Sequence, residues 1–218
     1  IFTRKHNWIM CVLYLGTFGS FIGFAAGFPL LIKSQFPAVD PVKYAFLGPL
    51  IGALVRPLGG WLSDKIKSGA VITQIVFIGM IVAVCGVLAF LPTDGQGGSF
   101  WGFFACFMAL FALTGLGNGS TCMQVPVIFL NMHQRFAEQG LVDAEQARLD
   151  ATKEGAAVIG FTAAFAAYGG FFIPKSYGTS IAITGSVNAA LIGFIVFYVL
   201  CGALNWWYYA RKGAEAKS

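Results

Sequence analysis

The sequence is poor in charge. Charged residues make up 11% of its 218 positions, against roughly 25% in an ordinary soluble domain. Hydrophobic residues make up 57%, which is more than a soluble domain usually contains. This composition excludes a disordered chain and a soluble globular enzyme, and it indicates a protein whose surface is largely covered by lipid.

The sequence also lacks the residue patterns of most enzymes and cofactor sites. Its five cysteines are widely spaced in apolar stretches without a C-x-x-C pair, so they predict neither a zinc site nor a redox motif. No Asp, Glu or His lies in the middle of an apolar segment, where haem ligands or a proton relay would be needed. We find no nucleophile–base pair and no phosphate-binding loop. We therefore expect no enzyme activity, no cofactor and no metal.

Long charge-free windows divide the chain into six apolar segments, and about 20 residues suffice to cross a bilayer. The sequence predicts an all-α membrane protein with a bundle of six transmembrane helices. We expect the one long connection, 133–154, to be a cytoplasmic helical loop, with a helix start in which Asp143 is the N-cap and Gln146 reaches back. The expected helices cover about 8–32, 44–63, 69–92, 99–131, 155–173 and 182–209.

Basic residues are distributed unequally between the two sides of the membrane. Six spans place both termini on one side, which holds ten Lys and Arg residues against three on the other. Because positively charged loops stay inside, we expect an integral protein of the cell (inner) membrane with both termini in the cytoplasm. The ten are Arg4, Lys5, Lys65, Lys67, Arg135, Arg148, Lys153, Arg211, Lys212 and Lys217, and the three are Lys33, Lys43 and Lys175.

Arg56 is the only charged residue that we place well inside a span. It lies eight residues before Asp64, so at about 1.5 Å per residue it is roughly 12 Å from the cytoplasmic end. An arginine in the membrane is costly and usually functional, and no acidic residue flanks this one. Its guanidinium therefore needs an anion, which a ligand can supply. The alternative is that the long side chain snorkels to the inner headgroups.

Further candidate binding residues lie in the first and fourth spans. Tyr14 and Phe18 are four residues apart, so they share one face of a helix. Asn118 and Ser120 lie near the middle of the fourth span. A guanidinium fork can bond two oxygens of a planar oxyanion, rings can cover its faces, and Asn or Ser can donate to the third oxygen. The set favours a small planar anion, although helix packing would also account for the aromatic and polar residues.

A glycine-rich run in the fourth span, GLGNGSTCMQVPVIF over 115–129, is specific enough to suggest a family. It closely resembles the second nitrate-signature motif of the nitrate/nitrite porter family, which belongs to the major facilitator superfamily. Residues 16–28 resemble that family's seventh helix, 54–65 its eighth and 154–161 its eleventh. The resemblance covers nearly the whole chain. It implies that residues 1–218 are the C-terminal six-helix half of a twelve-helix transporter.

The resemblance also implies a binding site. Family members bind nitrate between two arginines, one from each half, and Arg56 matches the one from this half. An N-terminal six-helix half, in the same or a separate chain, is then expected to supply the other arginine. The substrate-binding residues that we predict on this basis are Arg56, Tyr14, Phe18, Asn118, Gly117, Gly119 and Ser120.

The predicted function is transport of nitrate and nitrite by alternating access. We favour nitrate/nitrite antiport, because the spans contain no titratable carrier for proton symport. Two alternatives stay open: a facilitator-type transporter of another small anion or metabolite, and a non-transporting membrane subunit that packs against a partner. The expected partners are the substrate anions, membrane lipid and the other half. Nucleic acid is not among them, because the basic residues do not form one patch.

Overall fold

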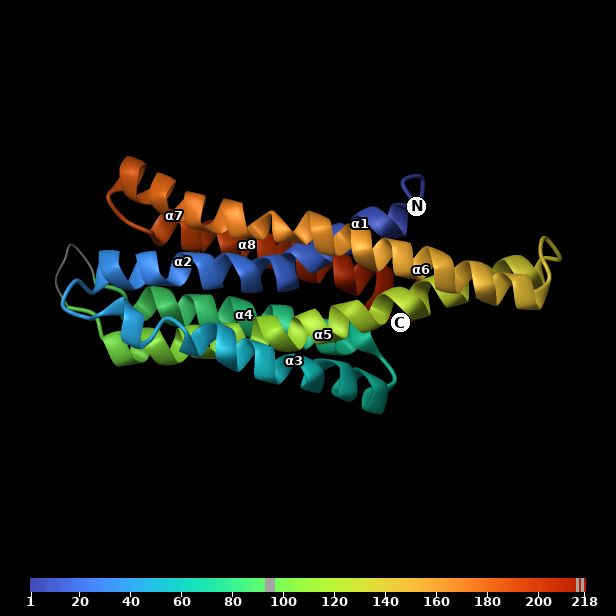
Figure 1. Ribbon diagram of the computed structural model, residues 1–218, viewed down its shortest axis with the longest axis horizontal. Coiled ribbons are helices and arrows are strands. Elements are labelled where there is room, and N and C mark those ends of the chain that lie inside the picture. The colour runs from blue at the N-terminus through green and yellow to red at the C-terminus, as the bar shows by residue number, and fades with distance from the viewer. Residues whose placement is uncertain (93–96, 215, 217) are drawn as a thin grey trace.

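The computed structural model describes residues 1–92, 97–214, 216 and 218, and over these residues the regular structure is entirely helical (Figure 1). This confirms the predicted all-α, six-span bundle. Six helices in the described part of the chain are long and apolar enough to cross a membrane. They are Lys5–Gln35, Pro41–Ile66, Gly69–Phe90, Phe100–Glu138, Ala144–Thr184 and Asn188–Ala210.

The first span contains a local irregularity that the sequence does not reveal. It consists of α1 (Lys5–Tyr14), the π-helical turn η1 (Leu15–Gly19) and α2 (Ser20–Gln35). A single π-helical turn inside an α-helix is rare and frequently marks a functional site. Here the turn includes one candidate binding residue, Phe18, and directly follows another, Tyr14.

The third and fourth spans each begin at a side-chain cap. Ser68 caps α4 by accepting a hydrogen bond from the Val71 amide, and Ser99 caps α5 by accepting one from the Gly102 amide. The segments in chain order are η2 (Pro41–Lys43), α3 (Leu47–Ile66), α4 (Gly69–Phe90) and α5 (Phe100–Glu138).

The long connection that we expect to be a helical loop, 133–154, is helical at both of its ends. The fourth span, α5, continues to Glu138, and α6 begins at Ala144, so only a short turn separates them. Helices do not end where the charges begin, because backbone hydrogen bonds persist in water and this stretch is rich in Ala, Glu, Gln and Lys, which favour helix. Asp143 caps α6 through the Glu145 amide.

Two details of the fifth span also differ from the sequence analysis. Gln146 does not reach back to the cap but donates to Asp150 one turn later. The helix does not end at 173, because α6 passes through a bend at Tyr168 into α7. The missing amide hydrogen of Pro174 is tolerated inside α7, as it often is in membrane helices. The closing segments are α6 (Ala144–Ala167), α7 (Gly169–Thr184), α8 (Asn188–Asn205) and the π turn η3 (Trp206–Ala210).

The arrangement of the helices places both chain ends toward the same end of the bundle. In Figure 1 the N and C labels lie toward the end that holds the α3–α4 and α5–α6 turns, whereas the α2–α3 and α7–α8 connections lie at the opposite end. The helix α5 packs against α3, α4 and α6, while α2 packs against α7 and α4 against α8. Lys217, one of the basic residues counted above, lies outside the described residues.

Close backbone approach through glycine holds several of these helices together. A Cβ at Gly119 would collide with the backbone of α3 at Arg56, and one at Gly115 would collide with Gly52 of the same helix. On the other side of the bundle, a Cβ at Gly23 would meet the Gly169 carbonyl. Small residues permit such contacts, which favour van der Waals packing between membrane helices.

Candidate functional site

Arg56 is the tenth of the 20 residues of α3, so it lies at the centre of the helix. Its side chain is exposed in this six-helix bundle. Among the residues that the structure describes, none forms a hydrogen bond or ion pair with the guanidinium. The guanidinium lies instead beside an aromatic ring. The guanidinium carbon lies 5.8 Å from the centre of the Phe18 ring, within cation–π range.

The Phe18 ring belongs to the π turn and is stacked on the ring of Tyr14. Their centres are 5.2 Å apart and their planes differ by 29°. The predicted pairing of these two residues on one helix face is therefore present. The result is a layered arrangement in which Tyr14 supports Phe18, and Phe18 faces the cation of α3.

Asn118 connects this aromatic pair to α5. The Tyr14 hydroxyl donates a hydrogen bond of 2.8 Å to Asn118 Oδ1, and both residues are buried. The Asn118 amide nitrogen keeps its donor capacity, because the tyrosine occupies the oxygen. Arg56, Phe18, Tyr14 and Asn118 thus form one continuous group, drawn from α3, η1, α1 and α5, which we call the Arg56 cluster.

The other three predicted residues lie on different faces of α5. Ser120 is fully buried; its hydroxyl lies 2.8 Å from Thr73 Oγ1 of α4 and donates to the Gly117 carbonyl. Gly117 packs against the Thr17 side chain and α4, whereas Gly119 packs against the α3 backbone at Arg56. The structure therefore does not bring Ser120 to the Arg56 cluster. Gly119 touches the cluster only through the main chain of α3.

Comparison with known proteins identifies the family. The chain is 46% identical over 219 residues to the nitrate/nitrite transporter NarU of Escherichia coli (strain K12), covering 100% of this chain and 46% of the relative. It is 40% identical over 220 residues to the probable nitrate/nitrite antiporter NarK2 of Thermus thermophilus, covering 99% of this chain and 44% of the relative. The chain belongs to this family of nitrate/nitrite transporters. It spans about half the length of the curated relatives that it matches. No family model matches it.

Membership in the nitrate/nitrite transporter family agrees with the resemblance on which the sequence analysis relied. The two relatives are a nitrate/nitrite transporter and a probable nitrate/nitrite antiporter and not enzymes, as the sequence predicts. With its six apolar helices, this family member is an integral membrane protein. Half-length coverage also agrees with the expected six-helix half of a longer fold.

In this family member, a second group of buried polar residues escaped the sequence analysis. Gln124 donates to the Thr73 hydroxyl at 2.7 Å, and Thr73 meets Ser120, so α4 and α5 are joined by side-chain hydrogen bonds. Thr17 donates weakly to Thr121 and links the first span to the same group. The sequence held no clear signal for this group, because a threonine in a membrane helix can satisfy itself on its own backbone, as Thr17 also does with Leu13.

Proposed function

We propose that this chain is the C-terminal six-helix half of a transporter that moves nitrate and nitrite across the cell membrane by alternating access. One observation supports this proposal most strongly. Arg56 lies at the centre of a membrane helix without an acidic partner in the described residues, and it is exposed on an open face of the bundle. A charge held at that depth is costly without a counter-ion. A transported anion supplies it.

The Arg56 cluster suits a trigonal oxyanion. The guanidinium fork bonds two of its oxygens, and the Phe18 ring offers an apolar surface beside the plane of the ion. Asn118 keeps an amide donor for the third oxygen while its own oxygen is held by Tyr14. Within the predicted binding set, Gly117, Gly119 and Ser120 then act by packing α5 and positioning Asn118.

A complete carrier needs a second six-helix half to close the open side of Arg56. We propose that this half contributes a second arginine, which would share the charge of the anion. Basic residues are in excess on the side of the membrane that holds the two termini. Because such residues stay inside, the chain is oriented with both termini in the cytoplasm. The cavity then opens alternately to the two sides as the halves rock around the anion.

Antiport of nitrate for nitrite is the transport mode that the residues favour. Bringing one anion into an inside-negative cell costs about 2.3 kcal/mol per 100 mV. Exchange of one monovalent anion for another cancels this cost. Proton symport would also cancel it, but it requires a titratable group at membrane depth, and the spans offer no central carboxylate or histidine.

Counterflow in proteoliposomes tests the proposal directly. Vesicles loaded with nitrite and containing this half together with a porter N-terminal half should accumulate labelled nitrate, and Arg56→Ala should abolish the exchange. Arg148→Ala removes another exposed arginine, at the cytoplasmic end of α6, and should leave exchange intact. Equal exchange with and without Arg56 would reject the site.

The same vesicles separate the two alternatives. A facilitator for another anion would exchange organic acids in preference to nitrite, so competition by nitrite over organic acids favours a nitrate porter. A non-transporting subunit would bind no nitrate even when the two halves are shown to co-purify. That outcome would reject transport while leaving family membership unaffected.

A further inference from the structure

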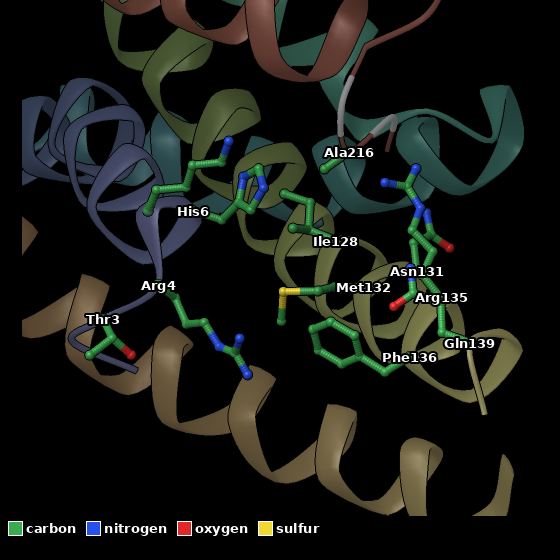
Figure 2. A pocket seen from close by; sticks show the side chains of 11 residues that line it. Thr3, Arg4, His6, Ile128, Asn131, Met132, Arg135, Phe136, Gln139 and Ala216 are labelled. Atoms are coloured by element: carbon green, nitrogen blue, oxygen red, sulfur yellow. The ribbon is translucent and has the colours of Figure 1, made fainter. Parts of the chain in front are cut away.

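Two cavities of about 340 Å³ each lie in the half of the bundle that holds the chain termini. One lies beside Arg135, between the start of α1 and the end of α5, and Figure 2 shows Arg4, Met132 and Phe136 around it. Its lining includes the charged side chains of both arginines. The other is a groove between α4 and α8, and none of the described residues that line it is charged. The two cavities therefore differ in chemistry, and the second suits a largely apolar ligand.

The second cavity, which we call the α4–α8 groove, is formed by residues within 74–81 of α4 and 198–206 of α8. Both stretches belong to membrane spans, and neither helix supplies a residue to the Arg56 cluster. Ile78 and Val199, which line the groove, are 55% and 51% exposed. Large apolar side chains on the surface of a membrane bundle contact lipid. We therefore expect the groove to face lipid when a second half covers Arg56.

One polar side chain lies among the apolar walls of the groove. Gln74 Oε1 accepts a hydrogen bond of 2.9 Å from Asn205, which fixes the side chain. The Gln74 Nε2 group has no hydrogen-bond partner among the described residues, and a Cβ at Gly202 would lie 3.4 Å from it. Because Gln74 and Gly202 both line the groove, this amide group can donate to a ligand there. A polar group at membrane depth is costly until it finds such an acceptor.

The groove runs lengthwise between the two helices. Seven residues separate Gln74 from Ile81 on α4, and seven separate Val199 from Trp206 on α8, so the groove is about 10 Å long. Gln74 is the sixth residue of α4, so the amide lies near the helix start and the apolar walls extend from it toward the middle of the bilayer. This is the direction in which an acyl chain enters the hydrocarbon core, while its ester group stays near the interface.

Basic and aromatic groups lie at the end of the groove nearest Gln74. Trp206 lines this end, and the Arg211 amide donates to the Trp206 carbonyl, so Arg211 lies one turn of η3 further on. The Arg211 guanidinium carbon is 4.2 Å from the centre of the Trp207 ring, and Nε donates to the Trp207 carbonyl. Its terminal nitrogens have no hydrogen bond to any described residue. Tryptophans are typical of the membrane interface, where a basic residue attracts anionic lipid.

We propose that the α4–α8 groove binds one anionic phospholipid. An acyl chain lies along the groove, an ester carbonyl accepts from the Gln74 amide, and the phosphate lies at Arg211. These three features of the protein follow one another in the same order as the chain, the ester and the phosphate of a phospholipid. Only the assignment of this lipid to the cytoplasmic leaflet rests on the proposed orientation, since binding itself requires no transport.

Native mass spectrometry of the 218-residue chain, released from nanodiscs of phosphatidylglycerol and phosphatidylcholine in equal amounts, tests the site. We expect one phosphatidylglycerol to stay bound per chain, with saturation at one. Ala203→Phe fills the groove from an exposed position and should lower the retained lipid about tenfold or more. Ala189→Phe is the matched control, because it adds the same ring at an exposed position of α8 outside the groove.

Two further variants test the polar contacts. Gln74→Glu keeps an oxygen that accepts from Asn205 but removes the amide donor, so it should also lower retention about tenfold. Arg211→Gln should reduce the preference for phosphatidylglycerol over phosphatidylcholine about fivefold, whereas Arg148→Gln, on α6, should leave it unchanged. An unchanged thermal transition in each variant will show that the fold is intact.

Three results would overturn the site. Retention that rises with lipid content without saturation indicates ordinary boundary lipid only, and so does equal retention by Ala203→Phe and Ala189→Phe. A second copy of the chain, bound in place of the lipid and lost in Ala203→Phe, would assign the groove to self-association. Arg56→Ala should retain the lipid even where nitrate exchange is lost, so failure of one proposal leaves the other testable.

Discussion

Arg56 and Phe18 come from two different spans, and the guanidinium carbon of Arg56 lies 5.8 Å from the centre of the Phe18 ring. Beyond Phe18, the Tyr14 ring continues the stack and reaches Asn118 of α5. The cation of α3 is therefore positioned by groups of two other spans.

The shape of the Arg56 cation should matter as much as its charge. Arg56→Lys keeps the charge but loses the planar fork, so nitrate exchange should fall about tenfold or more, the equivalent of one charge-assisted hydrogen bond. Initial rates of counterflow in proteoliposomes measure the effect, with Arg148→Lys as the control. Normal exchange by Arg56→Lys would reject bidentate recognition.

The hydrogen bond from Tyr14 to Asn118 should contribute to stability. Tyr14→Phe leaves Asn118 Oδ1 buried without its donor, which should cost about 1–3 kcal/mol. Unfolding of the purified chain in detergent measures this. Tyr168→Phe is the control, because that tyrosine is 62% exposed. A double-mutant cycle with Asn118→Ala should give a coupling energy clearly above zero, and additive effects would contradict the pairing.

Contact between α3 and α5 should depend on Gly119. In Gly119→Ala the added methyl group meets the α3 backbone at Arg56, so the variant should lose about 1–3 kcal/mol through overpacking. Gly193→Ala is the matched control on α8, where nothing lies within 4 Å of an added Cβ. It should be neutral or stabilising by about 0.5–1 kcal/mol. Similar thermal transitions for the two variants would argue against this contact.

A charged contact at the end of the bundle should hold three helices together. Glu154 of α6 accepts from Arg4 at 2.9 Å and lies 2.7 Å from the His133 ring nitrogen of α5. Glu154→Gln removes the charge that both partners face and should destabilise the chain by about 1–3 kcal/mol. Glu145→Gln changes an exposed carboxylate on the same helix and should have little effect. Thermal unfolding at neutral pH measures both, and equal midpoints would contradict the role.

Much of the architecture could be predicted from the sequence, because the relevant signals are local. The length of a charge-free window decides whether a segment can cross a bilayer, and an even number of spans places both ends on one side. Arg56 was recognisable for the same reason, since a charge amid apolar neighbours is visible without any knowledge of the fold. Helix ends were less predictable, because α5 continues beyond its apolar window to Glu138 and α6 begins before its own, at Ala144.

Contacts between spans were decided by the tertiary structure. Asn118 and Ser120 are two residues apart on α5, yet one accepts from Tyr14 and the other meets Thr73 of α4, because residues two apart face different neighbours on a helix. The π turn that contains Phe18 and the cavity beside Arg135 are likewise seen only in the structure. The sequence alone determined which residues cross the membrane and which one carries a charge there. The packing of α1, α3 and α5 decided which side chains meet that charge, because each helix face is assigned only when its neighbours are in place.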